Sequence, residues 1–130
     1  MAEIMIARLN HVGVVVRDCR ASVEWYLRHF GVRELYDYSF PGVEASFIRK
    51  GDFRFEFFQA EGAAPMAHER KHIDTNIKIG GINHFALEVD DINEVFATLQ
   101  RDGVNVVQPP AEIPGSNGER FGLSAMATEC

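Results

Sequence analysis

Hydrophobic and polar residues alternate along the chain in an order that predicts the same set of elements twice. An apolar, β-branched run at Val12 to Val16 is typical of a buried strand. The segment after it repeats apolar residues at helical spacing, from about Arg20 to Gly31. Three further stretches, 32–38, 43–49 and 53–59, alternate or cluster as strands, with turns between them. The first part of the chain is therefore predicted to fold as β-α-β-β-β.

The beginning of this pattern returns 73 positions later. Leu9-Asn10-His11 becomes Ile82-Asn83-His84, and an aspartate closes both strand patterns. Residues 82–89 are predicted to form a strand, and Asp91 is predicted to begin a helix with one apolar face. Because the same supersecondary pattern occurs twice, the sequence predicts two related modules that each carry a histidine at the start.

The end of the second module departs from the repeat. Residues 104–107 are predicted to be a strand that Pro109-Pro110 ends, which leaves only Arg120 to Cys130 for the last two strands. The polar segment 60–80 is predicted to be a linker. We therefore predict one domain over residues 1–130, made of a module at 8–59, the linker at 60–80 and a module at 81–130 that is shortened at its C-terminus.

Composition and charge exclude several classes of protein. The 130 residues are 46% hydrophobic and carry a net charge of −6, so a basic surface for nucleic acid is not expected. No apolar run approaches the length of a membrane helix, and the N-terminus lacks the basic start of a secretory signal. We expect no nucleic-acid partner, no membrane partner and a cytoplasmic location. Cys19 and Cys130 have neither the number nor the spacing of a disulfide framework or a zinc site.

Three polar residues stand in strongly apolar strand patterns. His11 and His84 occupy equivalent repeat positions, and Glu56 lies between phenylalanines in 53–58. Alternation points Glu56 away from Phe55 and Phe57, which are expected to pack under the first helix. A buried carboxylate needs a partner, which is either a metal ion or an arginine such as Arg54 or Arg49. A buried histidine can likewise be a metal ligand or a hydrogen-bonded core residue.

The two modules, each opening on an apolar-Asn-His strand, resemble the vicinal oxygen chelate superfamily, which includes glyoxalase I, methylmalonyl-CoA epimerase, extradiol dioxygenases and bleomycin-resistance proteins. The resemblance covers about residues 8 to 110. It implies an α+β fold in which two paired βαβββ modules form an open, curved β-barrel around a divalent metal. By this resemblance His11, Glu56 and His84 are the metal ligands, and Zn²⁺, Ni²⁺, Mn²⁺ or Fe²⁺ suits that donor set. The fourth ligand of the family, a glutamate on the last strand, has no recognisable counterpart, although Glu129 stands one repeat after Glu56.

The resemblance implies two alternative functions. One is a metal-dependent lyase, isomerase or epimerase of the glyoxalase-like type that acts on a small oxygenated substrate. The other is a metal-free module of the bleomycin-resistance type that binds or sequesters a small molecule. The sequence assigns no catalytic base. It does predict a homodimer, because a shortened module leaves strand edges open, and His11 and Glu56 of one chain would then face His84 of the other.

Overall fold

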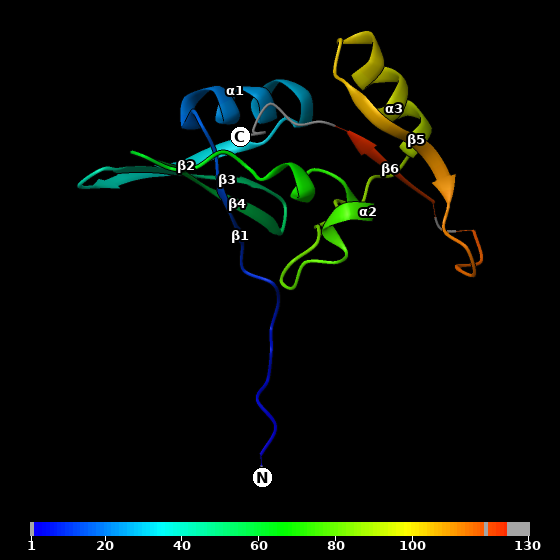
Figure 1. The fold of residues 1–130 in the computed structure, drawn as a ribbon, viewed down its shortest axis with the longest axis horizontal. Helices are drawn as coiled ribbons and strands as arrows, with labels where there is room; N and C mark the ends of the chain where they lie inside the picture. Colours follow the sequence, from blue (N-terminus) through cyan, green and yellow to red (C-terminus); the bar gives the residue numbers. More distant parts are fainter. Residues whose placement is uncertain (1, 119, 125–130) are drawn as a thin grey trace. The chain divides into compact units, whose positions relative to one another are not determined.

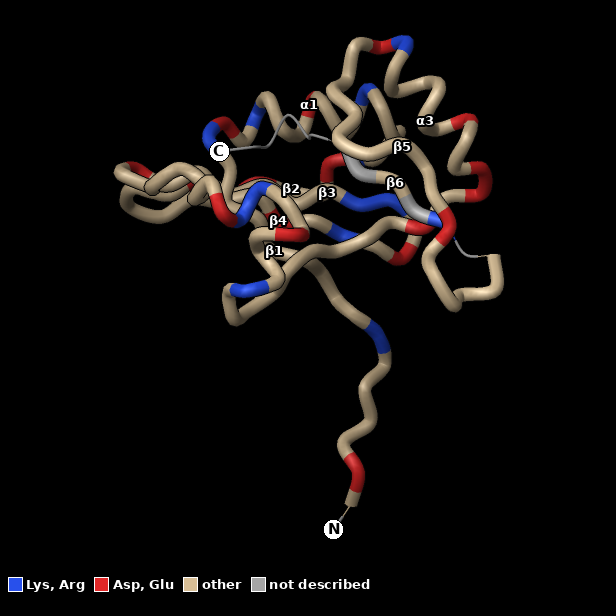
Figure 2. The backbone as a smooth tube through the Cα atoms, turned by 45° about the vertical axis from the view of Figure 1, so that its right-hand side comes forward, with Lys and Arg blue, Asp and Glu red and all other residues tan. Residues whose placement is uncertain are grey.

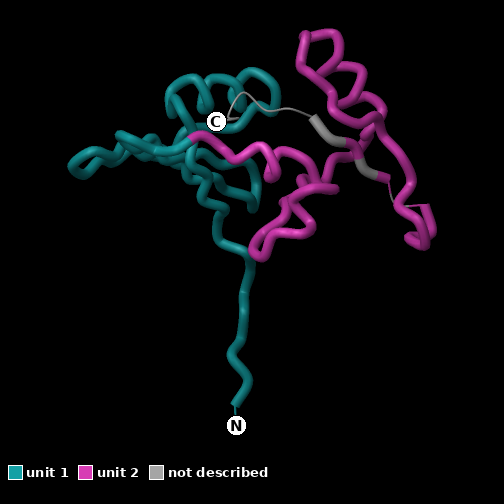
Figure 3. The backbone as a smooth tube through the Cα atoms, viewed as in Figure 1, with its two compact units in different colours: residues 1–64, 130 teal, residues 65–129 magenta. Residues whose placement is uncertain are grey.

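The protein is described by a computed structural model, which covers residues 2–118 and 120–124, the side chains of 121, 123 and 124 excepted. Figure 1 shows the helices and strands of this part of the chain. They belong to two compact units whose boundary lies between Ala64 and Pro65 (Figure 3). Each unit is described by itself.

The first unit is a four-stranded sheet with one helix. In chain order its elements are β1 (Val12–Val15), α1 (Cys19–Phe30), β2 (Arg33–Phe40), β3 (Val43–Lys50) and β4 (Phe53–Ala60). The strands lie in the order β1-β4-β3-β2, with β1 parallel to β4 and the other pairs antiparallel. The predicted β-α-β-β-β module is thus confirmed.

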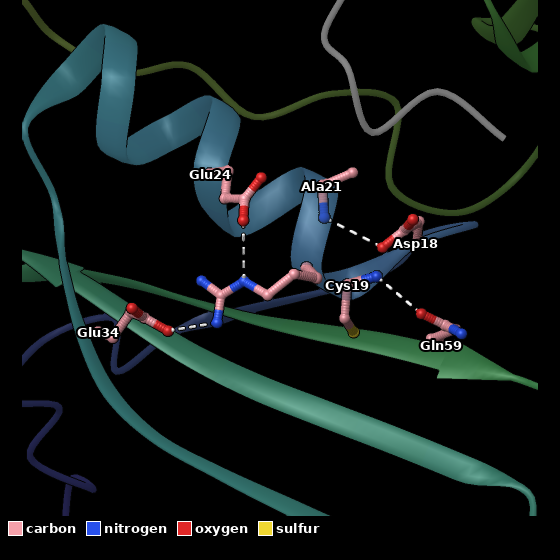
Figure 4. A network of polar contacts seen from close by, with 7 residues as sticks. Asp18, Cys19, Ala21, Glu24, Glu34 and Gln59 are labelled. Carbon is pink, nitrogen blue, oxygen red and sulfur yellow. Dashed lines mark hydrogen bonds and ion pairs between the residues drawn. The ribbon is translucent and has the colours of Figure 1, made fainter.

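Local signals at both ends explain why α1 forms where the sequence predicts it. The Asp18 carboxylate accepts a hydrogen bond from the Ala21 amide at 3.0 Å, so it caps the first turn (Figure 4). Gly31 ends the helix with a φ of 60°, a left-handed conformation that residues with a side chain rarely adopt. On the outer surface Arg20 bridges Glu24 and Glu34.

The core of the first unit lies between α1 and the sheet face that α1 covers (Figure 1). Phe55 and Phe57 are buried, and their rings lie 5.2 and 5.4 Å from the ring of Tyr26 on α1. Val23 and Ile48 complete this packing and are also buried. The prediction that Phe55 and Phe57 pack under the helix is confirmed, and Glu56 between them points to the other face.

The second unit contains short helices, one longer helix and an antiparallel strand pair. Its elements are η1 (His68–Arg70), α2 (Ile73–Asn76), α3 (Ile92–Arg101), β5 (Val106–Glu112) and β6 (Arg120–Ser124). Asp91 caps α3 through hydrogen bonds from the amides of Asn93 and Glu94, as predicted. The helix and the first strand after it therefore repeat the first module, whereas the pairing of two modules into a barrel remains a prediction.

The strand predicted at 82–89 is not formed in the described part of the chain. In the first unit the equivalent strand, β1, is held by β4, the last strand of its module. The counterpart of β4 would begin 73 positions after Phe53, beyond the described residues. Since a strand needs a hydrogen-bonded neighbour, an apolar pattern alone does not produce one. The segment is anchored instead by Asn76, whose side-chain amide donates to the Asn83 carbonyl at 3.0 Å.

The prediction that Pro109-Pro110 ends a strand was also wrong, because β5 continues through both prolines to Glu112. Its pairing with β6 is shifted between Gln108 and Ala111, so the ladder is irregular where the prolines supply no N–H donor. Gly122 faces this stretch, and a Cβ there would lie 3.5 Å from the nitrogen of Pro110. That distance is an ordinary van der Waals contact, so the packing opposite the prolines does not require a glycine.

Acidic and basic residues are spread along the chain (Figure 2). None of the helices in the described residues is both long enough and apolar enough to cross a membrane.

Candidate metal centre

The sheet of the first unit has a second face, opposite α1, which we call the open face. The register places Tyr36, Phe47, Glu56 and Gly13 side by side across the four strands, and all belong to this face. Several of its aromatic residues are partly exposed, among them Tyr36 at 52%. Gly13 has no side chain, and a Cβ there would lie 3.4 Å from the ring of Phe58.

His11 and Glu56 come together on the open face. The Nε2 atom of His11 lies 3.9 Å from Oε1 of Glu56, and the imidazole ring packs edge-on against Phe47 at 5.2 Å. The Glu56 side chain is only 12% exposed, against 37% for His11. Two residues that the sequence singled out separately, 45 positions apart, therefore form one polar site.

Tyr38 is a third member of this site, although its sequence pattern is more typical of a core aromatic and did not single it out as a site residue. Its hydroxyl donates a hydrogen bond of 3.1 Å to Oε2 of Glu56, across strand β3. Partial burial, this hydrogen bond and the negative charge of Glu56 raise the pKa of the Tyr38 hydroxyl. The phenol therefore stays protonated at neutral pH and acts as a donor, which fixes one carboxylate oxygen and leaves the other facing His11.

The expected alternative partners of Glu56 are engaged elsewhere. Arg49 donates to the carbonyl of Gly51 at 2.8 Å. Arg54 lies over the Phe47 ring, with its guanidinium carbon 4.8 Å from the ring centroid, and reaches the side-chain oxygen of Asn10. The contacts recorded for the Glu56 carboxylate are thus with His11 and Tyr38 rather than with an arginine.

The chemistry of this pair fits a divalent cation. Metal–ligand bonds to imidazole nitrogen and carboxylate oxygen are about 2.0–2.2 Å, so donors 3.9 Å apart lie within reach of one ion. An imidazole and a partly buried carboxylate form a donor set typical of Zn²⁺, Mn²⁺ or Fe²⁺ sites. The described residues contain no group of three His, Cys, Asp or Glu side chains that could hold a metal by itself, so the pair needs a further ligand.

The third predicted ligand, His84, lies outside this unit. His84 is exposed and belongs to the second unit, where its Nδ1 atom lies 2.6 Å from Oδ1 of Asn83. Its convergence with His11 and Glu56 stays a prediction. Glu129 lies outside the described residues.

Cys19 is not a second reactive centre. It is 4% exposed, and its thiol faces the carbonyl oxygen of Phe57 at 3.5 Å. Burial, together with the charge of Glu44, raises the pKa of the Cys19 thiol to about 11. At neutral pH the thiolate population is negligible, so Cys19 acts as a core residue.

Comparison with known proteins identifies a family whose sequence model matches this chain. The sequence model of the Glyoxalase/Bleomycin resistance protein/Dioxygenase superfamily matches residues 8–127. Methylmalonyl-CoA epimerase of Dictyostelium discoideum is 29% identical over 92% of this chain and 70% of its own length. The bovine enzyme is 29% identical over 88% of this chain and 64% of its own length. The chain therefore spans about two thirds of the length of these relatives.

A bacterial relative and a solved structure agree with this match. Ethylmalonyl-CoA/methylmalonyl-CoA epimerase of Cereibacter sphaeroides is 30% identical over 88% of this chain and 85% of its own length. A glyoxalase family protein from Enterococcus faecalis has a similar structure, with a TM-score of 0.75 and 18% identity over 94% of this chain and 91% of its own. This second likeness supports the fold alone.

Proposed function

Because the chain belongs to the Glyoxalase/Bleomycin resistance protein/Dioxygenase superfamily, we propose that it is a metal-dependent epimerase or isomerase whose substrate is an acyl-CoA thioester. One observation carries the proposal: Nε2 of His11 and Oε1 of Glu56 face each other at 3.9 Å on the open face. His84 is the proposed third ligand. The curated relatives that act on CoA thioesters support the choice of substrate class.

Epimerisation moves one proton and changes no oxidation state. The carbon beside the thioester carbonyl loses its hydrogen as a proton from one face and takes up a proton that has exchanged with solvent on the opposite face. A divalent metal bound at this site supplies a Lewis acid for the negative charge that develops on the substrate oxygens. His11 and Glu56 would hold the ion, while the Tyr38 hydroxyl keeps the Glu56 carboxylate in place through its hydrogen bond.

The direct test is solvent deuterium incorporation. The protein, loaded with Zn²⁺, Ni²⁺, Mn²⁺ or Fe²⁺, is incubated with methylmalonyl-CoA in D₂O, and mass spectrometry follows deuterium at the carbon beside the thioester. We expect metal-dependent incorporation that stops when a chelator is added. Incorporation at the uncatalysed rate with every metal would contradict the proposal.

Exposed apolar residues of the open face favour a second candidate function. Tyr36, Phe40 and Val15 are each about half exposed, at 52%, 51% and 52%, so an apolar molecule could pack on them without any metal. Such binding would make the protein a metal-free binding module of the bleomycin-resistance type, the alternative function given above. Binding of an aromatic ligand that a chelator does not weaken, with no deuterium incorporation, would favour it.

A row of arginines supports an anionic substrate. Arg33, Arg49 and Arg54 are direct cross-strand partners on β2, β3 and β4, an arrangement in which like charges repel. Gly31, Arg33, Arg49, Lys50 and Gly51 line a shallow hollow at this end of the sheet. Among the described residues no ion pair joins this row to a carboxylate, although the protein has a net charge of −6. The phosphates of CoA would match this local positive charge.

Removing charge from the hollow should weaken binding of the CoA portion alone. In Arg33→Gln or Arg49→Gln, loss of one charged hydrogen bond should raise KM for the CoA thioester about 10-fold and leave kcat nearly unchanged. KM for an N-acetylcysteamine thioester, which lacks the phosphates, should not change. Arg28→Gln, which removes an exposed arginine of α1, is the matched control. Equal effects of all three variants would contradict a specific phosphate contact.

We also propose that the protein is a homodimer. In the first unit β2 is an outer strand of the sheet, and among the described residues it pairs with one strand, β3, so that its other edge can accept a strand of a second chain. A second chain that covers such an edge could also supply His84 to the His11 and Glu56 pair. Sedimentation velocity at micromolar concentration should therefore give the mass of a dimer. A monomer under those conditions would remove this proposal.

A further inference from the structure

A chain of polar contacts leads from the open face to the His11 ring. The Arg54 guanidinium lies over Phe47, and its Nη1 atom donates to Oδ1 of Asn10 at 3.4 Å. The same Asn10 oxygen lies 2.7 Å from Nδ1 of His11. Arg54 is thus connected to His11 through one amide group.

These contacts determine which way the Asn10 amide points. A guanidinium can only donate hydrogen bonds, so the Asn10 atom that faces Arg54 has to be the oxygen. An oxygen can only accept, and the short contact with His11 therefore requires a hydrogen on Nδ1. In the neutral ring Nε2 then carries a lone pair, and this is the atom that faces Glu56 at 3.9 Å.

The second unit repeats the arrangement. Asn83 presents its Oδ1 to Nδ1 of His84 at 2.6 Å, and its backbone carbonyl accepts from Asn76, which is 4% exposed. An asparagine directly before the histidine thus contacts the same ring nitrogen in both units. In the second unit Oδ1 of Asn83 makes this contact, while its buried Nδ2 atom has no hydrogen-bond partner among the described residues.

We propose that Asn10 and Asn83 are positioning residues that fix the Nδ1–H tautomer of His11 and His84, and that Arg54 sets the orientation of Asn10. The neutral histidine side chain in water prefers the opposite tautomer, with its hydrogen on Nε2. The asparagines would therefore hold each ring with Nε2 unprotonated and ready to bind a cation. The metal-binding role of Nε2 in this tautomer rests on the proposed function. The tautomer itself does not.

The test uses the metal-free protein, so its result is independent of metal binding and of activity. Long-range ¹H–¹⁵N spectra of ¹⁵N-histidine-labelled protein, recorded at about pH 8.5 where an ordinary histidine is neutral, identify the tautomer of each ring. We expect Nδ1–H for His11 and His84 in the wild type. Asn10→Leu should shift His11 towards Nε2–H and leave His84 unchanged, and Asn83→Leu should do the reverse.

Conservative variants separate positioning from general structural damage. Asn10→Asp keeps an acceptor and should retain Nδ1–H at His11. Arg54→Lys keeps a pure donor and should do the same, whereas Arg54→Leu frees the Asn10 amide and should give a mixture. In a metal titration Asn10→Leu should lower the Zn²⁺ affinity about 10–100-fold, and Asn10→Asp should have a much smaller effect.

Two results would overturn the inference: Nε2–H at His11 in the wild type, or Nδ1–H that persists in Asn10→Leu. A wild type that has the expected tautomers but binds no metal would leave the inference standing and would remove the proposed function instead. The two proposals can therefore fail separately.

Discussion

Glu56→Gln is expected to lower deuterium incorporation about 100-fold or more, even with excess metal. The substitution keeps the shape of the side chain and an oxygen that Tyr38 can still donate to. It removes the negative charge that faces His11, and a neutral amide is a poor ligand for the cations proposed here. The measurement is the mass-spectrometric incorporation rate at saturating metal and substrate.

The matched control for this variant is Glu44→Gln, on neighbouring strand β3 but exposed and on the face that α1 covers. It should keep the wild-type rate. Thermal unfolding should show that both variants fold, because neither residue belongs to the hydrophobic core. A Glu56→Gln protein with the wild-type rate would rule out Glu56 as a ligand.

His84→Ala is expected to abolish stoichiometric binding of divalent metal without unfolding the protein. Losing one of three protein ligands leaves a two-ligand site, which holds such ions weakly. The side chain is exposed, so its removal creates no cavity and the unfolding midpoint should stay within the usual range for surface substitutions. Metal content is measured by elemental analysis of protein purified without a histidine tag.

His72→Ala, which removes another exposed histidine of the second unit, is the control and should bind metal as the wild type does. Equal metal content in wild type and His84→Ala would show that His84 is not a ligand. Loss of metal in both variants would point to nonspecific binding by surface histidines.

The sequence predicted those parts of the fold that depend on neighbouring residues. Both long helices begin at aspartates, Asp18 and Asp91, whose side chains bond amides two or three residues further on. It failed where an element depends on a distant partner. Residues 82–89 have the apolar pattern of a strand but form none in the described part of the chain, and β5 passes through two prolines that the local pattern marks as a strand end.

For the candidate site, too, the sequence placed the residues that depend on local pattern and not those that depend on distant contacts. Alternation along a single strand was enough to place Glu56 on the face opposite the core, and the repeat was enough to single out His11. Tyr38 could not be found in this way. Its contact with Glu56 crosses β3. The contact also depends on a register shift between Glu34 and Tyr36, which no local sequence pattern predicts. Arg54 was considered only as an ion-pair partner of Glu56, whereas cross-strand packing on Phe47 directs it towards Asn10.

The most direct measurement of the central claim is X-ray absorption at the edge of a bound metal. Protein loaded with one equivalent of Zn²⁺ should give a first shell of nitrogen and oxygen at about 2.0–2.2 Å, with outer-shell scattering from two imidazole rings. These rings would be those of His11 and His84. In His84→Ala, any metal that is still bound should show outer-shell scattering from one imidazole ring fewer. A wild-type site with one imidazole, with none, or with no stoichiometric metal would contradict the account.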